Sequence, residues 1–316
     1  MSDRAPERIA VIGAGSIGVA WAIVFARAGH QVDVHEIDPN RLSAIPAEIR
    51  TRVEGLVEHG LAAADNDIPG RISLGSDLAA AVARAGYIQE CTPESVDAKR
   101  AMFGQLDAMA PADTVLASSS SMIACSRFAA ELPGRARCLV VHPGNPPYLL
   151  PVAELVPAPF TDPAVVQRAR DLLTGAGMVT IDVHAEVEGF VFNRLQGALL
   201  REAYALVAEG VVSPTDVDRI VQLGLGLRWS VLGPFATADL NARGGLERHA
   251  AVLGPAYARM GAQRGSSAEA WPSNLVARVA DELHRNQPLE DWSERVEQRD
   301  HALMVLLAAR QAAGLE

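Results

Sequence analysis

The chain has few cysteines, and none of the three belongs to a Cys-x-x-Cys pair. Cys91, Cys125 and Cys138 cannot all pair with one another, so the sequence indicates neither a disulfide framework nor a zinc site. We therefore expect small buried thiols in a protein of the reducing cytoplasm, with no bound metal.

Long apolar runs and an excess of positive charge are missing as well. No apolar stretch is long enough to span a bilayer, and residues 1–8 contain no apolar core of a signal peptide. The formal net charge of −10 at pH 7 argues against nucleic acid and anionic membrane surfaces as main partners. With 316 residues, of which 49% are hydrophobic, the chain is long enough for two globular domains.

A glycine-rich turn follows the first β-branched run of the chain. Residues 8–12 lead directly to Gly13, Gly15 and Gly18. In the dinucleotide-binding pattern, the first glycine permits a tight strand-to-helix turn and the second lets the backbone approach a pyrophosphate. The third lets the helix pack on the sheet. The N-terminus of that helix then offers unpaired N–H groups to the phosphates.

An acidic residue completes the pattern. Glu36 closes the next apolar run, where a carboxylate can accept hydrogen bonds from ribose hydroxyls. It would repel the 2′-phosphate of NADP, and Asp38 adds a second negative charge. A plain tight turn with a solvated acid would explain neither the order nor the spacing. The sequence therefore predicts an NAD site.

Strand-like and helix-like segments alternate through the first part of the chain. The predicted strands cover residues 8–12, 31–35, 71–74, 87–90, 114–117, 138–142, 152–156 and 178–183. The predicted helices cover about 16–29, 41–60, 77–84, 95–109, 122–131 and 163–174. Such alternation predicts an α/β fold with a Rossmann-type, doubly wound parallel sheet. Asp162 and Pro163 are typical of a helix start, and Gly175 of a helix end.

Strand signals cease after this sheet. Apolar residues recur at helical spacing over 189–209, and Ser213-Pro214-Thr215-Asp216 is typical of a further helix start. We expect an NAD-binding domain over residues 1–186 and an all-helical substrate and dimerisation domain over residues 187–316.

Four polar residues lie where this architecture would bring them toward the nicotinamide. Ser121 ends a serine run after a strand, and His142 ends the strand that precedes a proline-rich loop. Glu154 lies on the returning strand, and Asn193 opens the first helix of the second half. A histidine paired with a carboxylate can accept the hydroxyl proton of an alcohol, while hydroxyl and amide donors stabilise the alkoxide. Any one of these residues alone more often has an ordinary structural role.

At these residues the chain resembles the L-3-hydroxyacyl-CoA dehydrogenase superfamily and, within it, the lambda-crystallin (L-gulonate 3-dehydrogenase) branch. The resemblance covers nearly the whole chain. It rests on the glycine loop, residues 89–94, the serine run 118–121, and residues 142–146, 152–156, 188–194 and 224–229. The steps of 21 residues from Ser121 to His142 and of 12 from His142 to Glu154 match the catalytic spacing of the family.

The resemblance assigns roles to these residues. It implies that His142 is the acid/base and that Glu154 pairs with it, while Ser121 and Asn193 hold the substrate oxygen. The dinucleotide contacts that it implies are Ser16, Ile17, Glu36, Glu94 and Lys99.

Several positions depart from the acyl-CoA enzymes. Gly144 replaces their usual aromatic residue, and the hairpin at 41–70, which helps them hold coenzyme A, has no lysine and few arginines here. Arg228-Trp229 resembles gulonate and carnitine dehydrogenases, and we hypothesise that Arg228 pairs with a substrate carboxylate. A surface ion pair explains Arg228 equally well. Asn193-Arg194 favours the gulonate type over the carnitine type.

The sequence thus predicts a cytoplasmic, homodimeric enzyme that uses NAD to oxidise the 3-hydroxyl of a small hydroxy acid such as L-gulonate. Three alternatives remain open. The substrate could be an L-3-hydroxyacyl-CoA, or it could be carnitine. The protein could also be a non-catalytic, crystallin-like NAD(H)-binding protein.

Overall fold

The computed structural model describes residues 7–243, 245–264, 273–286 and 288–314. These residues form two compact units, of which the first contains the chain up to Leu195 together with Arg299–Ala313. The second contains Gln196–Gln298.

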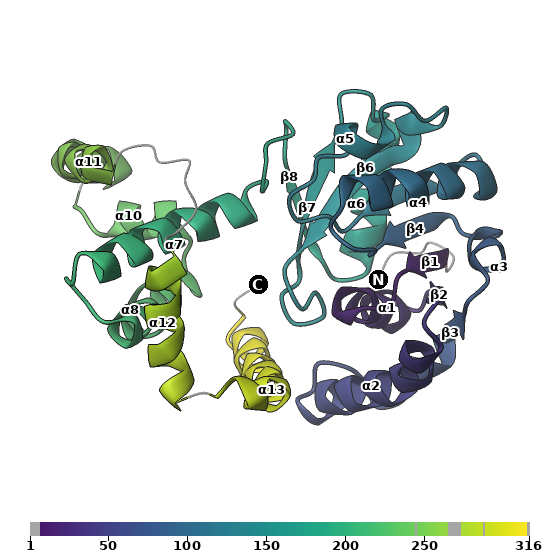
Figure 1. Cartoon of the computed structure of the whole chain (residues 1–316), viewed down its shortest axis with the longest axis horizontal. Helices are drawn as coiled ribbons and strands as arrows, with labels where there is room; N and C mark the ends of the chain where they lie inside the picture. Colours follow the sequence, from purple (N-terminus) through teal and green to yellow (C-terminus); the bar gives the residue numbers. More distant parts are fainter. Residues whose placement is uncertain (1–6, 244, 265–272, 287, 315–316) are drawn as a thin grey trace. The chain divides into compact units, whose positions relative to one another are not determined.

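An eight-stranded sheet is the centre of the first unit (Figure 1). Its strands are β1 (Arg8–Ile12), β2 (Gln31–His35), β3 (Ile72–Gly75), β4 (Tyr87–Glu90), β5 (Val115–Ser118), β6 (Cys138–Pro143), β7 (Val152–Pro157) and β8 (Val179–Asp182). Their spatial order is β3-β2-β1-β4-β5-β6-β7-β8, which contains the 3-2-1-4-5-6 order of the Rossmann fold. All neighbours are parallel except β6 and β7, which are antiparallel. The predicted strands are confirmed to within one residue.

The helices of the first unit follow the expected sequence signals. They are α1 (Ser16–Arg27), α2 (Pro39–Glu58), α3 (Leu78–Val82), α4 (Val96–Met109), α5 (Ser126–Ala129) and α6 (Pro163–Gly175). The side chain of Asp162 accepts a hydrogen bond from the backbone N–H of Ala164, which confirms the predicted start of α6. This helix ends at Gly175, but Gly177 is the residue with the left-handed backbone, at φ +82°.

One predicted helix, over residues 122–131, is wrong in extent, because α5 contains only Ser126–Ala129. The carboxylate of Glu94 accepts hydrogen bonds from the backbone N–H groups of Ser121, Met122 and Ile123. A backbone held by a distant side chain in this way cannot continue the helix toward its N-terminus.

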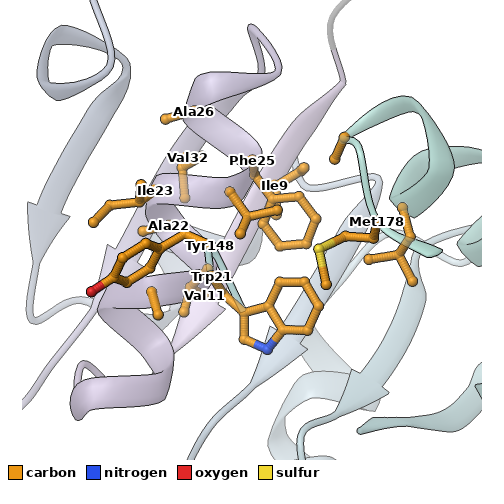
Figure 2. Packing of buried hydrophobic residues seen from close by; sticks show 14 of the residues in the cluster. Ile9, Val11, Trp21, Ala22, Ile23, Phe25, Ala26, Val32, Tyr148 and Met178 are labelled. Carbon is orange, nitrogen blue, oxygen red and sulfur yellow. The ribbon is translucent and has the colours of Figure 1, made fainter. Parts of the chain in front are cut away.

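Alternation along the strands divides the core into two layers. Ile9 and Val11 of β1 belong to one apolar cluster, and Ala10 and Ile12 belong to the other. The first cluster contains side chains of α1, α2 and α6, and the second contains side chains of α3, α4 and α5. Figure 2 shows part of the first cluster, where Trp21 stacks near Phe25 with ring centroids 5.3 Å apart. The sheet is therefore covered by helices on both faces, as a doubly wound fold requires.

The cysteines are free thiols, two of them buried and Cys91 partly buried. Burial raises the pKa of both Cys91 and Cys138 to about 12. Such thiols stay protonated at neutral pH and are poor nucleophiles. Among the described residues, no group of three or more acidic, histidine or cysteine side chains could hold a metal ion.

The last helix, α13 (Trp292–Ala312), returns to the first unit with its residues from 299 onward. Met304 is buried in the first apolar cluster and contacts the position of Gly55 in α2, and Figure 1 shows the two helices side by side. The hydroxyl of Tyr148 donates to a carboxylate oxygen of Asp300 over 2.9 Å. The end of the chain thus packs against α2 and the loop that follows β6.

The second unit consists of helices in the part of the chain that the structure describes. They are the end of α7 (Phe192–Ala208), α8 (Pro214–Ile220), a π-helical turn (Val221–Gly226), α9 (Leu227–Trp229), α10 (Pro234–Leu240), α11 (Gly245–Arg264), α12 (Ser273–Asn286) and the start of α13. The side chain of Ser213 accepts from the N–H of Asp216 over 3.1 Å, which confirms the predicted start of α8. No helix described in either unit is long and apolar enough to cross a membrane.

We expect Met304→Ala to destabilise the protein by about 2–5 kcal/mol, because it leaves a cavity between α13 and α2. Leu306→Ala, on the same helix at a side chain that is 60% exposed, is the matched control and should cost far less. Urea unfolding followed by circular dichroism measures both free energies. Equal losses for the two variants would contradict the packing of α13 described here.

Candidate active site

The glycine loop between β1 and α1 has the shape that a dinucleotide pyrophosphate needs. Gly13 has φ +95°, and a Cβ atom there would lie 2.8 Å from the carbonyl oxygen of Cys91. A Cβ at Gly18 would lie 1.9 Å from the carbonyl oxygen of Gly13, so neither position tolerates a side chain. At Gly15 a Cβ would meet nothing within 4 Å. The loop is therefore closed on its inner side and open where a phosphate would approach the first residue of α1, Ser16. Ile17, the next residue of that helix, packs partly buried against the core.

Glu36 lies at the end of β2 beside this loop. One carboxylate oxygen accepts from the N–H of Ala14 over 3.0 Å, and the other accepts from the N–H groups of Ile37 and Asp38 over 2.8 and 3.0 Å. Burial by itself raises the pKa of Glu36, but these three hydrogen bonds outweigh it and lower the pKa. The group is therefore charged at neutral pH, which favours ribose hydroxyls over a 2′-phosphate.

Two arginines of α2 reach the same loop, and sequence reasoning missed both. Arg41 donates through Nε to the carbonyl oxygen of Ala14 over 2.6 Å, and Arg52 donates to the carbonyl and hydroxyl oxygens of Ser16 over 3.3 Å. Glu48 forms ion pairs of 2.5 Å with each of them. No local sequence pattern predicts these contacts, because they depend on how α2 packs beside α1.

Lys99, the only lysine of the sequence, belongs to α4 and contacts Glu90, the last residue of β4. Its side chain is 1% exposed, and its Nζ lies 3.0 Å from a carboxylate oxygen of Glu90, which is fully buried. Lys99 also lies 3.7 Å from the carboxylate of Glu94. The structure thus places Lys99 in an interior ion pair, and a contact with the dinucleotide remains a prediction.

The four serines at the end of β5 and directly after it, Ser118 to Ser121, have separate roles. Ser118 donates to the buried carboxylate of Glu90 over 2.5 Å, and Ser119 accepts hydrogen bonds from the side chains of Trp21 and Gln89. Ser120 donates to Glu94 over 2.6 Å, while Ser121 and the two residues after it bind the same oxygen through their backbone N–H groups. These bonds outweigh the effect of burial and lower the pKa of Glu94. Glu94 therefore holds the loop that carries Ser121.

His142 and Glu154 face each other across the antiparallel pair of strands. They are cross-strand partners in the register of β6 and β7, and Nδ1 of His142 lies 2.7 Å from Oε2 of Glu154. The two residues are only 5% and 4% exposed. With Nδ1 bound to a carboxylate, the proton on the ring is held there and Nε2 is left as the acceptor.

The second oxygen of Glu154 is also occupied. Oε1 accepts from the backbone N–H groups of Val191 and Phe192 over 2.7 and 3.0 Å, at the start of α7. Burial raises the pKa of Glu154, but the hydrogen bonds from His142, Phe192 and Val191 outweigh it and lower the pKa. Because the folded pKa is depressed, this carboxylate stabilises the fold at neutral pH, and that contribution is lost as pH falls through its folded pKa.

Asn193 and Ser121 are brought together as well. The amide of Asn193 donates to the carbonyl oxygen of Ser121 over 2.9 Å. The four predicted catalytic residues therefore form two contacting pairs. One pair is bound through Glu154 to the N–H groups of Val191 and Phe192, and the other contains the next residue, Asn193. Arg228, by contrast, lies exposed in α9 of the second unit, and its contact with a substrate remains a prediction.

Lys99→Met should destabilise the protein by about 3–5 kcal/mol, because it leaves the carboxylate of Glu90 buried without a counter-charge. The double variant Glu90→Gln/Lys99→Met should recover part of this loss. Arg100→Met, which removes a largely exposed pair with Asp97, should cost about 1 kcal/mol or less. Urea titrations at equal protein concentration give the three free energies. A loss for Lys99→Met as small as that for Arg100→Met would show that the pair is not buried.

Comparison with known proteins identifies the family of the chain. The 3-hydroxyacyl-CoA dehydrogenase NAD-binding domain matches residues 8–187, and the C-terminal domain of the same family matches residues 189–283. The chain is 37% identical to a lambda-crystallin homolog of Bos taurus over 317 aligned residues, with 96% of each chain covered. It is 39% identical to an L-carnitine dehydrogenase of Streptomyces griseus, with 79% of this chain and 76% of the relative covered.

Among solved structures, a 5-formyl-3-hydroxy-2-methylpyridine 4-carboxylic acid 5-dehydrogenase, described as an NAD+ dependent dismutase, superimposes with a TM-score of 0.85. The two share 27% identity, and the match covers 99% of this chain and 100% of that one. Two domain matches that together span most of the chain, and relatives above 30% identity, are decisive for the family. The chain belongs to the 3-hydroxyacyl-CoA dehydrogenase family, in the branch of the lambda-crystallins, and is an NAD-dependent hydroxy acid dehydrogenase.

Proposed function

We propose that this protein oxidises the 3-hydroxyl of a small hydroxy acid, of the L-gulonate type, with His142 as the base. The observation that carries the proposal is the 2.7 Å contact between Nδ1 of His142 and Glu154, which leaves Nε2 as the acceptor of the ring. An imidazole in this state is suited to take a hydroxyl proton near neutral pH. NAD, when bound, supplies the acceptor for the hydride that leaves the carbon bearing this hydroxyl.

Each of the four residues has a defined part in this proposal. Nε2 of His142 takes the hydroxyl proton, and Glu154 stabilises the imidazolium that results. The Ser121 hydroxyl and the Asn193 amide hold the substrate oxygen as negative charge develops on it. In the reverse direction the imidazolium returns the proton to the alkoxide.

The glycine loop and its surroundings would hold the coenzyme. We assign Gly13, Gly15, Gly18, Ser16 and Ile17 to the pyrophosphate side and Glu36 to the adenosine ribose. The assignment is supported by the open space at Gly15 and by the charged state of Glu36. Glu94 would act there through the loop that it holds, and Lys99 through its ion pairs with Glu90 and Glu94.

A free acid is favoured over a coenzyme A ester by the charges around α2. A pocket between this helix and the following loop is lined by apolar residues together with four acidic residues, Glu54, Glu58, Asp65 and Asp67, and one basic residue, Arg50. Such a surface would repel the phosphates of coenzyme A. The names of the carnitine and pyridine carboxylic acid dehydrogenases also describe substrates with a free carboxylate. Arg228 is our candidate to bind that group.

We also propose that the protein is a homodimer and works in the cytoplasm. In the second unit, Val207, Pro214 and Thr237 are the buried residues among those whose exposure the structure describes. Large apolar side chains of that unit are exposed: Leu223, Leu227, Phe235 and Leu240 are each more than 60% exposed. An exposed apolar surface of this kind is typical of an interface between subunits, which light scattering can measure. The free cysteines favour a reducing compartment.

His142→Gln should lower kcat by about 10²–10⁴-fold, because glutamine keeps a donor toward Glu154 but cannot exchange the proton. His142→Ala should be inactive too. NADH affinity, measured by fluorescence titration, should change little in either variant, since the ring serves proton transfer. Retained turnover would refute the role of His142, and loss of NADH binding would mean that it serves the coenzyme instead.

A substrate panel tests the acid and its recognition together. We expect kcat/KM to be higher for L-gulonate or another small 3-hydroxy acid than for 3-hydroxybutyryl-CoA. Arg228→Ala should raise KM for the acid by about 10-fold or more without changing NADH affinity. A preference for the CoA ester would favour the hypothesis of a 3-hydroxyacyl-CoA dehydrogenase, and a preference for carnitine would favour that of a carnitine dehydrogenase. Activity on none of them would favour the hypothesis of a non-catalytic NAD(H)-binding protein. An unchanged KM in Arg228→Ala would show that Arg228 does not bind the substrate.

A further inference from the structure

Two consecutive residues with left-handed backbone precede α7. Gly189 has φ +74° and Phe190 has φ +49°, and Phe190 is the only described residue other than glycine with a positive φ. A phenylalanine in this region is strained. Its ring is fully buried in the second apolar cluster, and its N–H donates to the carbonyl oxygen of Val187 over 3.1 Å. The surrounding packing thus holds a backbone that the local sequence does not favour.

The consequence of this turn is a convergence of two N–H groups. Successive N–H groups that follow a left-handed turn form a concave site for an anion. Here the N–H groups of Val191 and Phe192 both point at Oε1 of Glu154, at the start of α7, where the first N–H groups have no partner inside the helix. The anion in this concavity is therefore a carboxylate of the protein itself.

We propose that residues 189–192 form a backbone anion site for Glu154, and that Gly189 and Phe190 act through it as positioning residues that set the basicity of His142. The proposal rests on the function proposed above. The two oxygens of the Glu154 carboxylate have different partners, because Oε1 is bound by the backbone and Oε2 by the imidazole.

This division has a chemical effect on the base. Hydrogen bonds to Oε1 draw negative charge away from Oε2, so the imidazolium of His142 gains less from its partner than it would from an unshared carboxylate. The ring therefore releases its proton more easily after each turnover. Residues 190–192 present two N–H groups to Glu154 and the rings of Phe190 and Phe192 to the imidazole, with ring centroids 5.7 and 6.1 Å away.

In the part of the chain that the structure describes, the hydrogen bonds of the Glu154 carboxylate come from His142 and from the N–H groups of Val191 and Phe192, and none comes from a lysine or an arginine. The neighbouring elements do carry charges that are paired or exposed. Asp182 of β8 is paired with Arg170 over 2.7 Å, and Glu90 at the end of β4 is paired with Lys99 over 3.0 Å. Glu188, before α7, and Arg194, in its first turn, are exposed.

Gly189→Ala is the variant that tests the backbone site. A Cβ there would lie 3.4 Å from the sulfur of Met122, which is ordinary contact, so the substitution acts on φ rather than by a clash. We expect the acid limb of the pH profile of kcat/KM for oxidation to move up by about half a unit to one unit, because His142 would gain a less shared carboxylate.

Gly177→Ala is the matched control. Gly177 has φ +82° with nothing within 4 Å of the added Cβ, and it lies between α6 and β8, outside the site. It should lose comparable stability and keep the limb where it is. A folded Gly189→Ala variant with an unmoved limb, or an equal shift in Gly177→Ala, would overturn the proposal.

A second measurement needs no variant. In the unsubstituted protein without substrate, the amide protons of Val191 and Phe192 should titrate together in NMR with a carboxylate whose pKa is below the usual glutamate range. Amide protons that do not titrate would refute the anion site whether or not His142 is the base. Conversely, a wild-type profile with no acid limb, together with titrating amides, would refute the catalytic proposal and the tuning of His142, and leave the anion site standing.

Discussion

The reversal of chain direction between β6 and β7 is the constraint on which the site depends. Every other neighbouring pair in the sheet is parallel, and this one pair is antiparallel. Directly opposite residues of an antiparallel pair have Cβ atoms about 5 Å apart. The register alone therefore brings His142 into reach of Glu154, and it does so at the end of the sheet where the glycine loop and the serine run also lie. A one-residue slip would turn one of the two side chains to the opposite face.

Three carboxylates, two of them buried, hold the loops around this site. Glu154 binds the first N–H groups of α7 as well as the imidazole, and Glu90 binds Ser118 and Lys99 in the interior. Glu94, at the edge, binds the loop of Ser121. Because a buried charge is costly without partners, Glu154 and Glu90 hold their donors in place, while Glu94 does so through its several hydrogen bonds at the surface. The segments that carry Ser121 and Asn193 are thereby fixed from the sheet side, although neither segment is a strand.

Much of the first unit could be predicted because its signals are local. Strand 8–12 ends at Gly13 for a steric reason that the sequence itself contains, and Asp162 caps α6 through its nearest neighbours. The errors and omissions have tertiary causes. The start of α5 is lost to Glu94, which lies far away in the sequence, and the approach of Arg52 to Ser16 depends on the packing of α2. Likewise, no sequence pattern in residues 299–313 predicts that they pack against α2.

The pairing of Lys99 with Glu90 has a practical consequence for work on this protein. Because the sequence contains a single lysine and its ammonium group lies in the interior, amine-directed reagents find no lysine at the surface of the described structure. Acylation of Lys99 requires that α4 separate from the end of β4, as happens in local opening. The rate of acylation at this one side chain therefore measures how often the coenzyme-binding half of the protein opens.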